Sequence, residues 1–150
     1  MELDELDKSI VKILQKDSRR GVRDIARELK VSPATVHNRI SKLIKMGVIR
    51  GFTTVLDYKM LGLDVTALIL TSVDGKHIID FEKDIAKHEN VVAVYDITGD
   101  FDVAIISKFK NISELDKFVK SLLRHPYVKR TVTSIVLNVV KEDFRVKLPF

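Results

Sequence analysis

The stretch "DIARELKVSPATVHNRISKLIKMGVI", residues 24–49, decides the fold of the first third of the chain. Apolar residues recur in it at helical spacing in two short runs, and only Lys30 and Val31 separate the first run from Ser32. Ser32 can cap a helix by accepting a first-turn N–H, and Pro33 suits the first turn because its missing N–H would be unpaired there anyway. So short a connection makes the two helices cross at a steep angle.

The second of these helices turns a polar side away from its core. Val36, Ile40 and Leu43 recur on the inward side, which leaves the polar residues on the flanking and opposite faces. Ser, Thr, Asn and His can bond base edges, Lys and Arg can reach phosphates, and a helix of this width fits the major groove. An ordinary solvated face is the alternative. The candidate DNA-binding residues are Ser32, Thr35, His37, Asn38, Arg39, Ser41, Lys42, Lys45 and Arg50.

The flanking sequence completes a three-helix unit. Leu3, Leu6, Ile10 and Leu14 recur at helical spacing before the quoted stretch, with acidic residues in the first turn. Gly47 can end the last helix in the left-handed conformation. We therefore expect a helix-turn-helix (winged-helix-like) domain.

The excess of positive charge lies in this same unit. The chain carries a net charge of +5 over 150 residues. Residues 1–50 hold 12 Lys and Arg against 7 Asp and Glu, whereas residues 51–150 hold 14 of each. A basic module joined to a neutral one favours a polyanionic partner for the first module.

The rest of the chain predicts a second domain with the order βαββαβ. Residues 49–56 read as a strand that leaves the basic module, and a turn-containing connection follows. Gly99-Asp100 reads as a two-residue hairpin turn. This order is the ferredoxin-like plan, an antiparallel sheet with both helices on one face, so the fold class is α+β. The expected elements are strands at 65–73, 91–98, 101–108 and 131–140 and helices at 78–87 and from Asn111 or Ser113 through Leu122.

Several of these strands are apolar on both faces. Leu68 and Leu70 alternate with Ala67 and Ile69, and residues 131–140 show the same pattern. Because helices cover only one face, the other would leave an apolar patch larger than monomers usually expose. We expect a two-fold homodimer that packs sheet on sheet.

Over essentially its whole length the chain resembles the Lrp/AsnC (leucine-responsive, feast/famine) transcription regulators. The resemblance rests on "LDELDKSIVKILQKDSR", on "DIARELKVSPATVHNRISKLIKMGVIRGFT", on "VYDITGDFDVAI" and on "HPYVKRTVTSIVLNVVKED". Lys30 departs from the family, which usually has Gly at this turn position, and a non-Gly residue there strains the backbone by about 1 kcal/mol.

The resemblance implies a small-molecule effector. In that family the second domain dimerises, dimers assemble further, commonly into octamers, and effectors that are often amino acids bind between dimers. Backbone N–H groups and hydroxyls would hold an α-carboxylate, and Asp100 or Asp102 an α-amine. A good turn and ordinary strand composition are the alternative explanation of these residues. The candidate effector-binding residues are Thr98, Gly99, Asp100, Asp102, Thr131, Thr133 and Ser134.

Enzymatic signals are poor. The sequence has no cysteine, no Gly-rich phosphate loop and no metal motif. His77 and His88 are eleven residues apart, about 16 Å along a helix, too far to share a metal. We therefore expect no enzyme, no metal and no cofactor other than a possible amino acid effector. No apolar run is long enough for a membrane span and no signal peptide is present, so we expect a cytoplasmic protein with no membrane partner.

The function expected is a sequence-specific regulator that binds double-stranded DNA and responds to an effector. An architectural protein that packs DNA with little sequence preference, or a metabolite-sensing module, remains the alternative. The expected division is a DNA-binding domain at 1–50, a linker strand and connection at 51–63, and a dimerisation and effector-response domain at 64–150.

Overall fold

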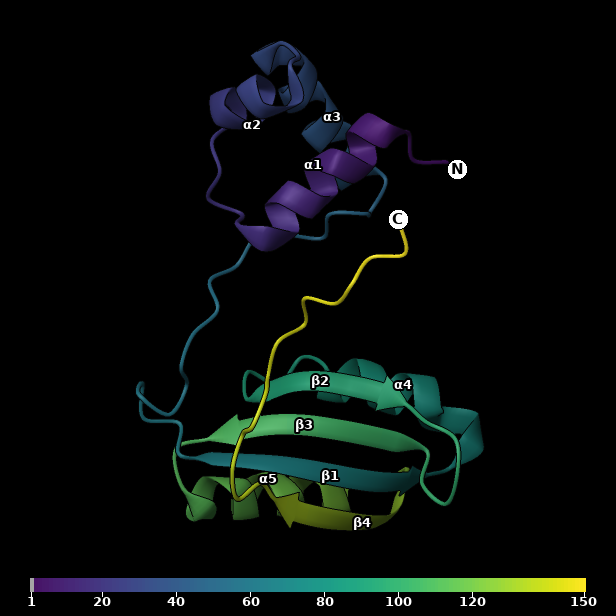
Figure 1. Cartoon of the computed structure of the whole chain (residues 1–150). Coiled ribbons are helices and arrows are strands. Elements are labelled where there is room, and N and C mark those ends of the chain that lie inside the picture. Colours follow the sequence, from purple (N-terminus) through teal and green to yellow (C-terminus); the bar gives the residue numbers. More distant parts are fainter. Residues whose placement is uncertain (1) are drawn as a thin grey trace. The chain divides into compact units, whose positions relative to one another are not determined.

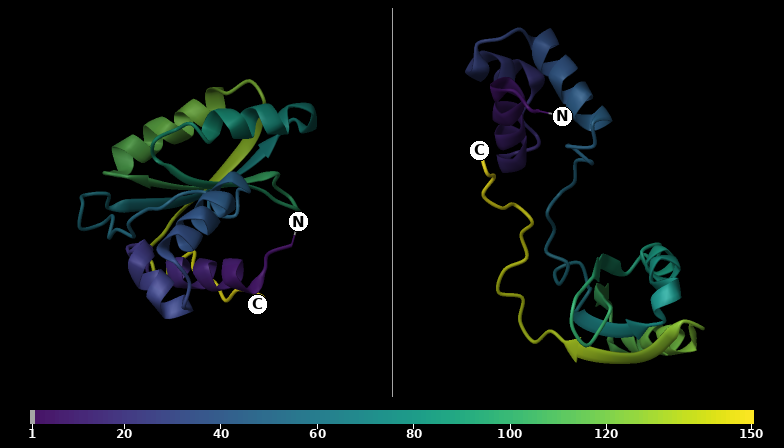
Figure 2. Two further views of the ribbon diagram at one scale, coloured as in Figure 1. Left: turned by 90° about the horizontal axis from the view of Figure 1, so that it is seen from above. Right: turned by 90° about the vertical axis from the view of Figure 1, so that its right-hand side faces the viewer.

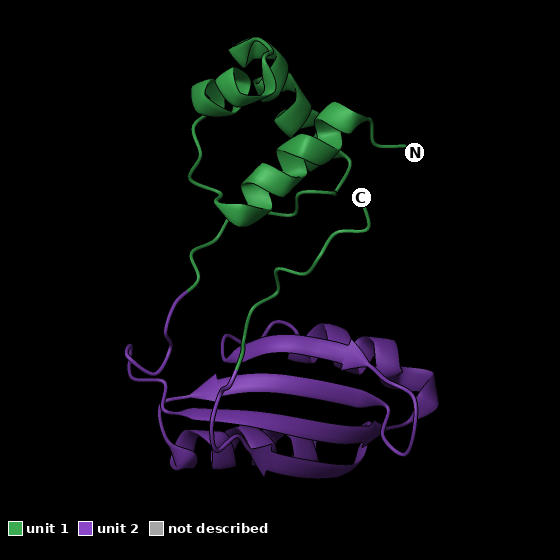
Figure 3. Cartoon of the chain, viewed as in Figure 1, with its two compact units in different colours: residues 1–55, 141–150 green, residues 56–140 purple. Residues whose placement is uncertain are grey.

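The structure is a computed structural model that describes residues 2–150 (Figure 1). The chain divides into two compact units, residues 1–55 with 141–150 and residues 56–140 (Figure 3). The elements are α1 (Glu5–Lys16), α2 (Val22–Leu29), α3 (Pro33–Lys45), β1 (Val65–Val73), a 3-10 turn (Gly75–His77), α4 (Ile78–Ile85), β2 (Val91–Asp96), β3 (Val103–Phe109), α5 (Ile112–Arg124) and β4 (Val128–Ile135).

The first unit is a three-helix domain whose turns follow the sequence signals. Lys30 ends α2 in the left-handed conformation, with φ 55° and ψ 43°, which confirms that a non-Gly residue carries the strained turn position. Ser32 caps α3, and Gly47, with φ 73°, follows its end as expected. The core of this unit consists of Ile10, Leu14, Ile25, Ala26, Val36 and Leu43.

A buried carboxylate joins α1 to α3. The Asp7 side chain is fully buried and accepts hydrogen bonds from Lys42 Nζ at 2.8 Å and from Arg39 Nη1 at 3.1 Å. Asp7 also shares a capping box with Asp4, whose carboxylate accepts the Asp7 N–H at 2.8 Å and contacts Arg39 as well. Burial alone raises the pKa of Asp7, but the bonds from Lys42 and Arg39 outweigh it, so the pKa lies below 3.8.

The second unit is a four-stranded antiparallel sheet in the order β2-β3-β1-β4, as the ferredoxin-like prediction requires. Both helices cover the same face (Figure 2). Phe81 of α4 and Leu115, Phe118 and Leu122 of α5 pack there against alternate residues of the strands, among them Ile69. Asn111, not Ser113, caps α5, because its side chain accepts the Glu114 N–H at 3.0 Å.

Three predicted elements differ from the structure. Residues 49–56 are not a strand, since no strand of the described part of the chain pairs with their backbone. The last strand begins at Val128 rather than at residue 131 and ends at Ile135. Ala67 pairs with Ile135, and one further bond, from the Val136 N–H to the Thr66 carbonyl at 2.8 Å, ends the ladder near the start of β1. Helix α4 ends at Ile85, two residues before the predicted end.

The predicted two-residue turn at Gly99-Asp100 is also wrong. Strand β2 ends at Asp96 and β3 begins at Val103, and one further bond from the Ile97 N–H to the Asp102 carbonyl leaves a longer loop. Asp102 bonds to both neighbouring strands, because its carbonyl accepts the Ile97 N–H and its own N–H donates to the Thr71 carbonyl at 3.1 Å. Gly99 supplies the positive φ, 110°, that the loop needs.

The Asp7 network makes the stability of the first unit depend on pH. We expect Asp7→Asn to lower the free energy of unfolding by about 2–3 kcal/mol near neutral pH, below the roughly 3–5 kcal/mol for a fully buried pair because Arg39 and Lys42 can turn to water. A lowered carboxyl pKa stabilises the fold above the unfolded value, close to 3.8, and this contribution is lost as the pH falls through the folded value. Denaturant melts from pH 7 downward should therefore show the gap between native and variant closing below about pH 4.

Asp24→Asn is the matched control, since Asp24 pairs with Arg27 on the surface of α2. It should change stability by less than about 0.5 kcal/mol at every pH. An Asp7 variant as stable as the Asp24 variant at pH 7 would contradict the role assigned to the network.

Candidate functional site

The outward side of α3 is a polar stripe. Helical spacing brings Ala34, His37, Asn38, Ser41 and Lys45 to one face, opposite the buried Val36 and Leu43. Ser41 is half-buried and the other four are exposed. No hydrogen bond or ion pair within residues 2–150 engages the side chains of His37, Asn38 or Lys45. This face is therefore free to bind an external partner.

Ser32 and Thr35 lie at the start of α3 and already bond to each other. The Ser32 Oγ accepts the Thr35 N–H at 3.0 Å, and the two hydroxyl oxygens are 2.8 Å apart. Each hydroxyl keeps acceptor capacity that faces water. Both residues can contribute contacts next to the stripe, at a helix N-terminus that favours anions.

The candidate cations of this region fall into two groups. Arg39 and Lys42 lie on the flank of α3 and are held by the acidic first turn of α1, through Asp4 and Asp7. The hydrogen bonds that Arg39 donates to the carboxylates of Asp4 and Asp7 raise the pKa of Arg39. Lys45 and Arg50 are exposed and have no ion pair among the described residues. The cations most available to phosphates are therefore Lys45 and Arg50.

No local sequence pattern distinguishes the two groups of cations. In the first turn of α1, Asp7 looks like a residue that only favours the helix dipole. Its partner Lys42 is 35 residues away, and only the fold brings the two together.

The first group of candidate effector residues lies at one end of the sheet, in the loop between β2 and β3. Thr98, Gly99 and Asp100 are exposed there. Asp102 differs from them, because its carboxylate accepts the Val73 N–H at 2.8 Å and the Ser72 hydroxyl at 3.3 Å. Asp102 therefore fixes the end of β1, which leaves Asp100 as the acidic side chain open to a ligand.

The candidate residues of β4 divide between two faces. Thr131 pairs with Thr71 and Thr133 with Ile69, so both lie on the helix-covered face. Ser134 pairs with Leu68 and is exposed on the open face. The Thr133 hydroxyl is buried with no hydrogen-bond partner. The structure thus brings β4 to the loop but does not place these hydroxyls in a single cluster.

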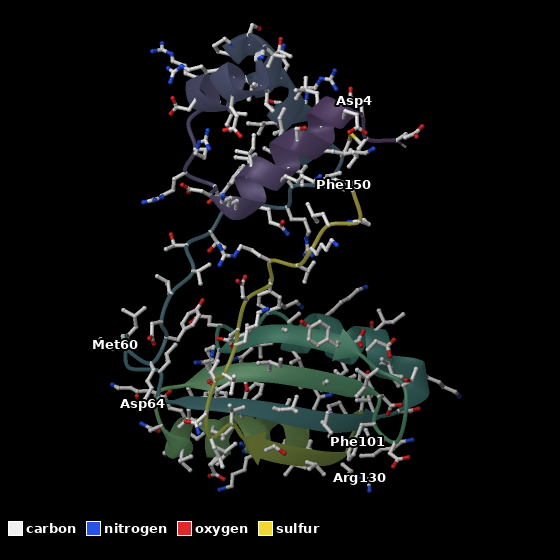
Figure 4. The ribbon with its side chains drawn as sticks, in the orientation of Figure 1. Asp4, Met60, Asp64, Phe101, Arg130 and Phe150 are labelled. Atoms are coloured by element: carbon white, nitrogen blue, oxygen red, sulfur yellow. The ribbon has the colours of Figure 1, made fainter. Side chains whose placement is uncertain are left out.

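Sequence reasoning missed two cations near the sheet. The Arg130 guanidinium of β4 lies 4.6 Å from the Phe101 ring, which links β4 to the 97–102 loop (Figure 4). Lys108 is buried on the open face, where its Nζ lies 3.2 Å from Thr66 Oγ1 and 5.3 Å from the centre of the Tyr58 ring. In the sequence, Lys108 stands at an alternate position of a strand whose other residues on the same face are apolar. This lone charge among apolar positions was the signal available for Lys108.

A hollow of about 260 Å³ lies elsewhere in this unit, between α4 and β2. Burial and the nearby charge of Asp96 raise the pKa of Glu82, which lines it. None of the candidate effector residues lines this hollow, and it is open to solvent, so we assign it no role.

Within residues 2–150, no three His, Cys, Asp or Glu side chains are grouped so that they could hold a metal ion. No helix of the described chain is both long and apolar enough to cross a bilayer.

Comparison with known proteins covers both units. Residues 3–44 match the model of the AsnC-type helix-turn-helix domain, and residues 66–146 match that of the Lrp/AsnC ligand binding domain. An uncharacterized HTH-type transcriptional regulator of Pyrococcus abyssi is 50% identical over 97% of this chain and 99% of its own. The HTH-type transcriptional regulator FL11 of Pyrococcus horikoshii is 39% identical over 93% of each chain.

A solved structure has the same fold. The transcriptional regulator NMB0573 of Neisseria meningitidis, crystallised with L-Met, superposes with a TM-score of 0.86 over 99% of this chain and 98% of its own, at 24% identity. The two matched domains and the relatives agree with the polar stripe of α3 and with the ferredoxin-like sheet. The chain therefore belongs to the Lrp/AsnC family of HTH-type transcriptional regulators, with a helix-turn-helix domain followed by a ligand-binding domain.

Proposed function

We propose that this regulator reads specific DNA sites with α3 and that a small effector, such as an amino acid, modulates its assembly or its DNA occupancy. The observation that carries the proposal is the exposed polar stripe on a helix that is capped, short and set on a rigid three-helix core. In the division proposed, residues 1–50 bind DNA, 51–63 connect and 64–150 dimerise and respond to the effector. A cytoplasmic location follows from contact with the chromosome.

The side chains of α3 would divide the work of recognition. His37, Asn38 and Ser41 can bond base edges in the major groove, and Asn is suited to a bidentate contact with adenine. Lys45 and Arg50 contact phosphates. Arg39 and Lys42 add positive charge at the flank, reduced by their bonds to Asp4 and Asp7.

The open face of the sheet supports a homodimer. Cross-strand pairing brings Tyr95, Ala104, Leu70 and Val132 into one row and Ala93, Ile106 and Leu68 into the next. Leu68 is 37% exposed, Tyr95 45% and Val132 46%, on a face that no helix of the described unit covers. Packing two such faces together removes this patch from water. The two α3 helices would then reach major grooves about 34 Å apart or at a multiple of that spacing.

The 97–102 loop is the proposed effector region. Exposed N–H groups and hydroxyls of Thr98 to Asp100 can bind an α-carboxylate, and the Asp100 carboxylate can bind an α-amine. Thr131, Thr133 and Ser134 are proposed as supporting residues, Ser134 from the open face, where a partner chain can complete the site, and Thr131 and Thr133 from the helix-covered face of β4. The L-Met bound by NMB0573 supports an amino acid as ligand class. Assembly of dimers into octamers is part of the same proposal.

Asn38→Ala tests base reading. A duplex selected from a random pool by the native protein should lose about 1–3 kcal/mol of binding free energy, while random duplex binds as before. Asn138→Ala, at an exposed position outside the strands, is the control and should bind both duplexes as the native protein does. Equal loss on selected and random DNA would show that Asn38 does not read bases.

Lys45→Ala and Lys42→Ala separate the two groups of cations. Lys45→Ala should weaken selected and random DNA alike and reduce the slope of log K against log salt by about 0.9, the contribution of one phosphate contact. Lys42→Ala should change that slope less and should also lower stability, because it leaves Asp7 with one partner fewer. A larger slope change for Lys42 than for Lys45 would refute the assignment.

Leu68→Glu tests the sheet-to-sheet dimer. The carboxylate remains in water in the monomer but would be buried without a partner in the dimer, so the dimer dissociation constant should rise at least about tenfold. Ile79→Glu, on the exposed side of α4, should leave it unchanged. Sedimentation equilibrium measures both constants, and an unchanged Leu68→Glu dimer would place the interface elsewhere.

A further inference from the structure

The last ten residues of the chain pack on the DNA-binding unit. Residues 141–150 group with residues 1–55 rather than with the sheet that precedes them (Figure 3). Gln15 of α1 donates from Nε2 to the Val146 carbonyl at 3.0 Å. The Phe150 ring lies beside α1, with Lys12 Nζ 5.3 Å and Lys8 Nζ 6.0 Å from its centre (Figure 4).

These contacts use one face of α1. Helical spacing places Lys8, Lys12 and Gln15 together, on the side opposite the buried Ile10 and Leu14. An aromatic ring under two ammonium groups is a favourable cation–π arrangement, and the amide bond to a backbone carbonyl fixes the register. These contacts of the tail involve α1 and no side chain of the polar stripe of α3, so a bound tail leaves the stripe's side chains free for DNA.

The chain consequently passes between its two units twice. One passage is the segment 46–64 between α3 and β1, and the other follows β4 and leads to residue 141. Residues 46–49 bond back to α3 and residues 58–63 form a turn, which leaves 50–57 without such bonds. A flexible segment of that length has a root-mean-square span of about 16 Å, so alone it would let the DNA-binding unit sample a wide volume. A second attachment at α1 reduces that volume.

We propose that residues 141–150 form a strap that binds the outer face of α1 in the same chain and restricts the DNA-binding unit. The inference rests on the proposed dimeric function. Restriction raises the effective concentration of the second α3 at the second half-site once the first is bound. The strap therefore increases affinity for paired half-sites and leaves affinity for a single half-site unchanged.

Engineered cysteines test the contact directly, because the native chain has none. In the full-length Gln15→Cys/Val146→Cys variant, a short bis-maleimide should join the two thiols within one chain. The linked protein should run as a monomer on a denaturing gel, and its digest should contain one cross-linked pair of peptides. Arg23→Cys/Val146→Cys, with its first thiol on the exposed side of α2, should not react in this way. Linkage between two chains, or none, would overturn the assignment of the strap to its own chain.

The Gln15→Ala/Phe150→Ala variant tests the consequence for DNA. Binding to paired half-sites should weaken roughly 3- to 10-fold, while binding to a single half-site stays within twofold. Val140→Ala, at a residue that precedes the strap and is 96% exposed, should change neither. An equal loss of affinity for both duplexes, or no loss for either, would overturn the proposed role of the strap. Absence of half-site binding by the native protein would instead overturn the proposed function, and the cross-link result would still stand.

Discussion

The buried carboxylate of Asp7 is the interaction on which the DNA-binding unit depends. It caps α1 through its exchange with Asp4, and it holds Arg39 and Lys42 of α3, so one side chain fixes the angle between the first helix and the recognition helix. The same bonds remove two of the candidate cations from free contact with phosphate. Stability and recognition are therefore coupled, since residues that position α3 cannot also serve as independent DNA contacts.

The sheet sets the second constraint. Its helix-covered face is closed by Phe81, Phe118 and their neighbours, whereas Leu68 and Tyr95 remain partly exposed on the other face. No helix within residues 2–150 covers that face, and a second copy offers the same pattern in the same register. Dimerisation would satisfy the sheet and, at the same step, set the separation of two recognition helices. The ligand-binding domain and the DNA-binding domain would thus communicate through assembly.

Much of the fold could be predicted from the sequence wherever the signal is local. The bounds of α3 follow from Ser32, Pro33 and Gly47, which act within one turn of themselves. The end of β4 could not be predicted, because it depends on where β1 offers its last partner residue. The pairing of Asp7 with Lys42 is likewise set by tertiary structure. Strand alternation does predict that Thr131 and Thr133 lie on one face and Ser134 on the other. The candidate effector residues were grouped without regard to this alternation.

The most direct test of the central claim is fluorescence anisotropy of a labelled duplex taken from upstream of the protein's own gene, titrated with protein at two salt concentrations against excess random duplex. A sequence-specific regulator that reads bases through α3 should retain the labelled duplex in the presence of the competitor, at both salt concentrations. If the random competitor displaced all of the labelled duplex, and if binding fell steeply with salt, the protein would contact phosphates alone. That result would contradict base reading through α3.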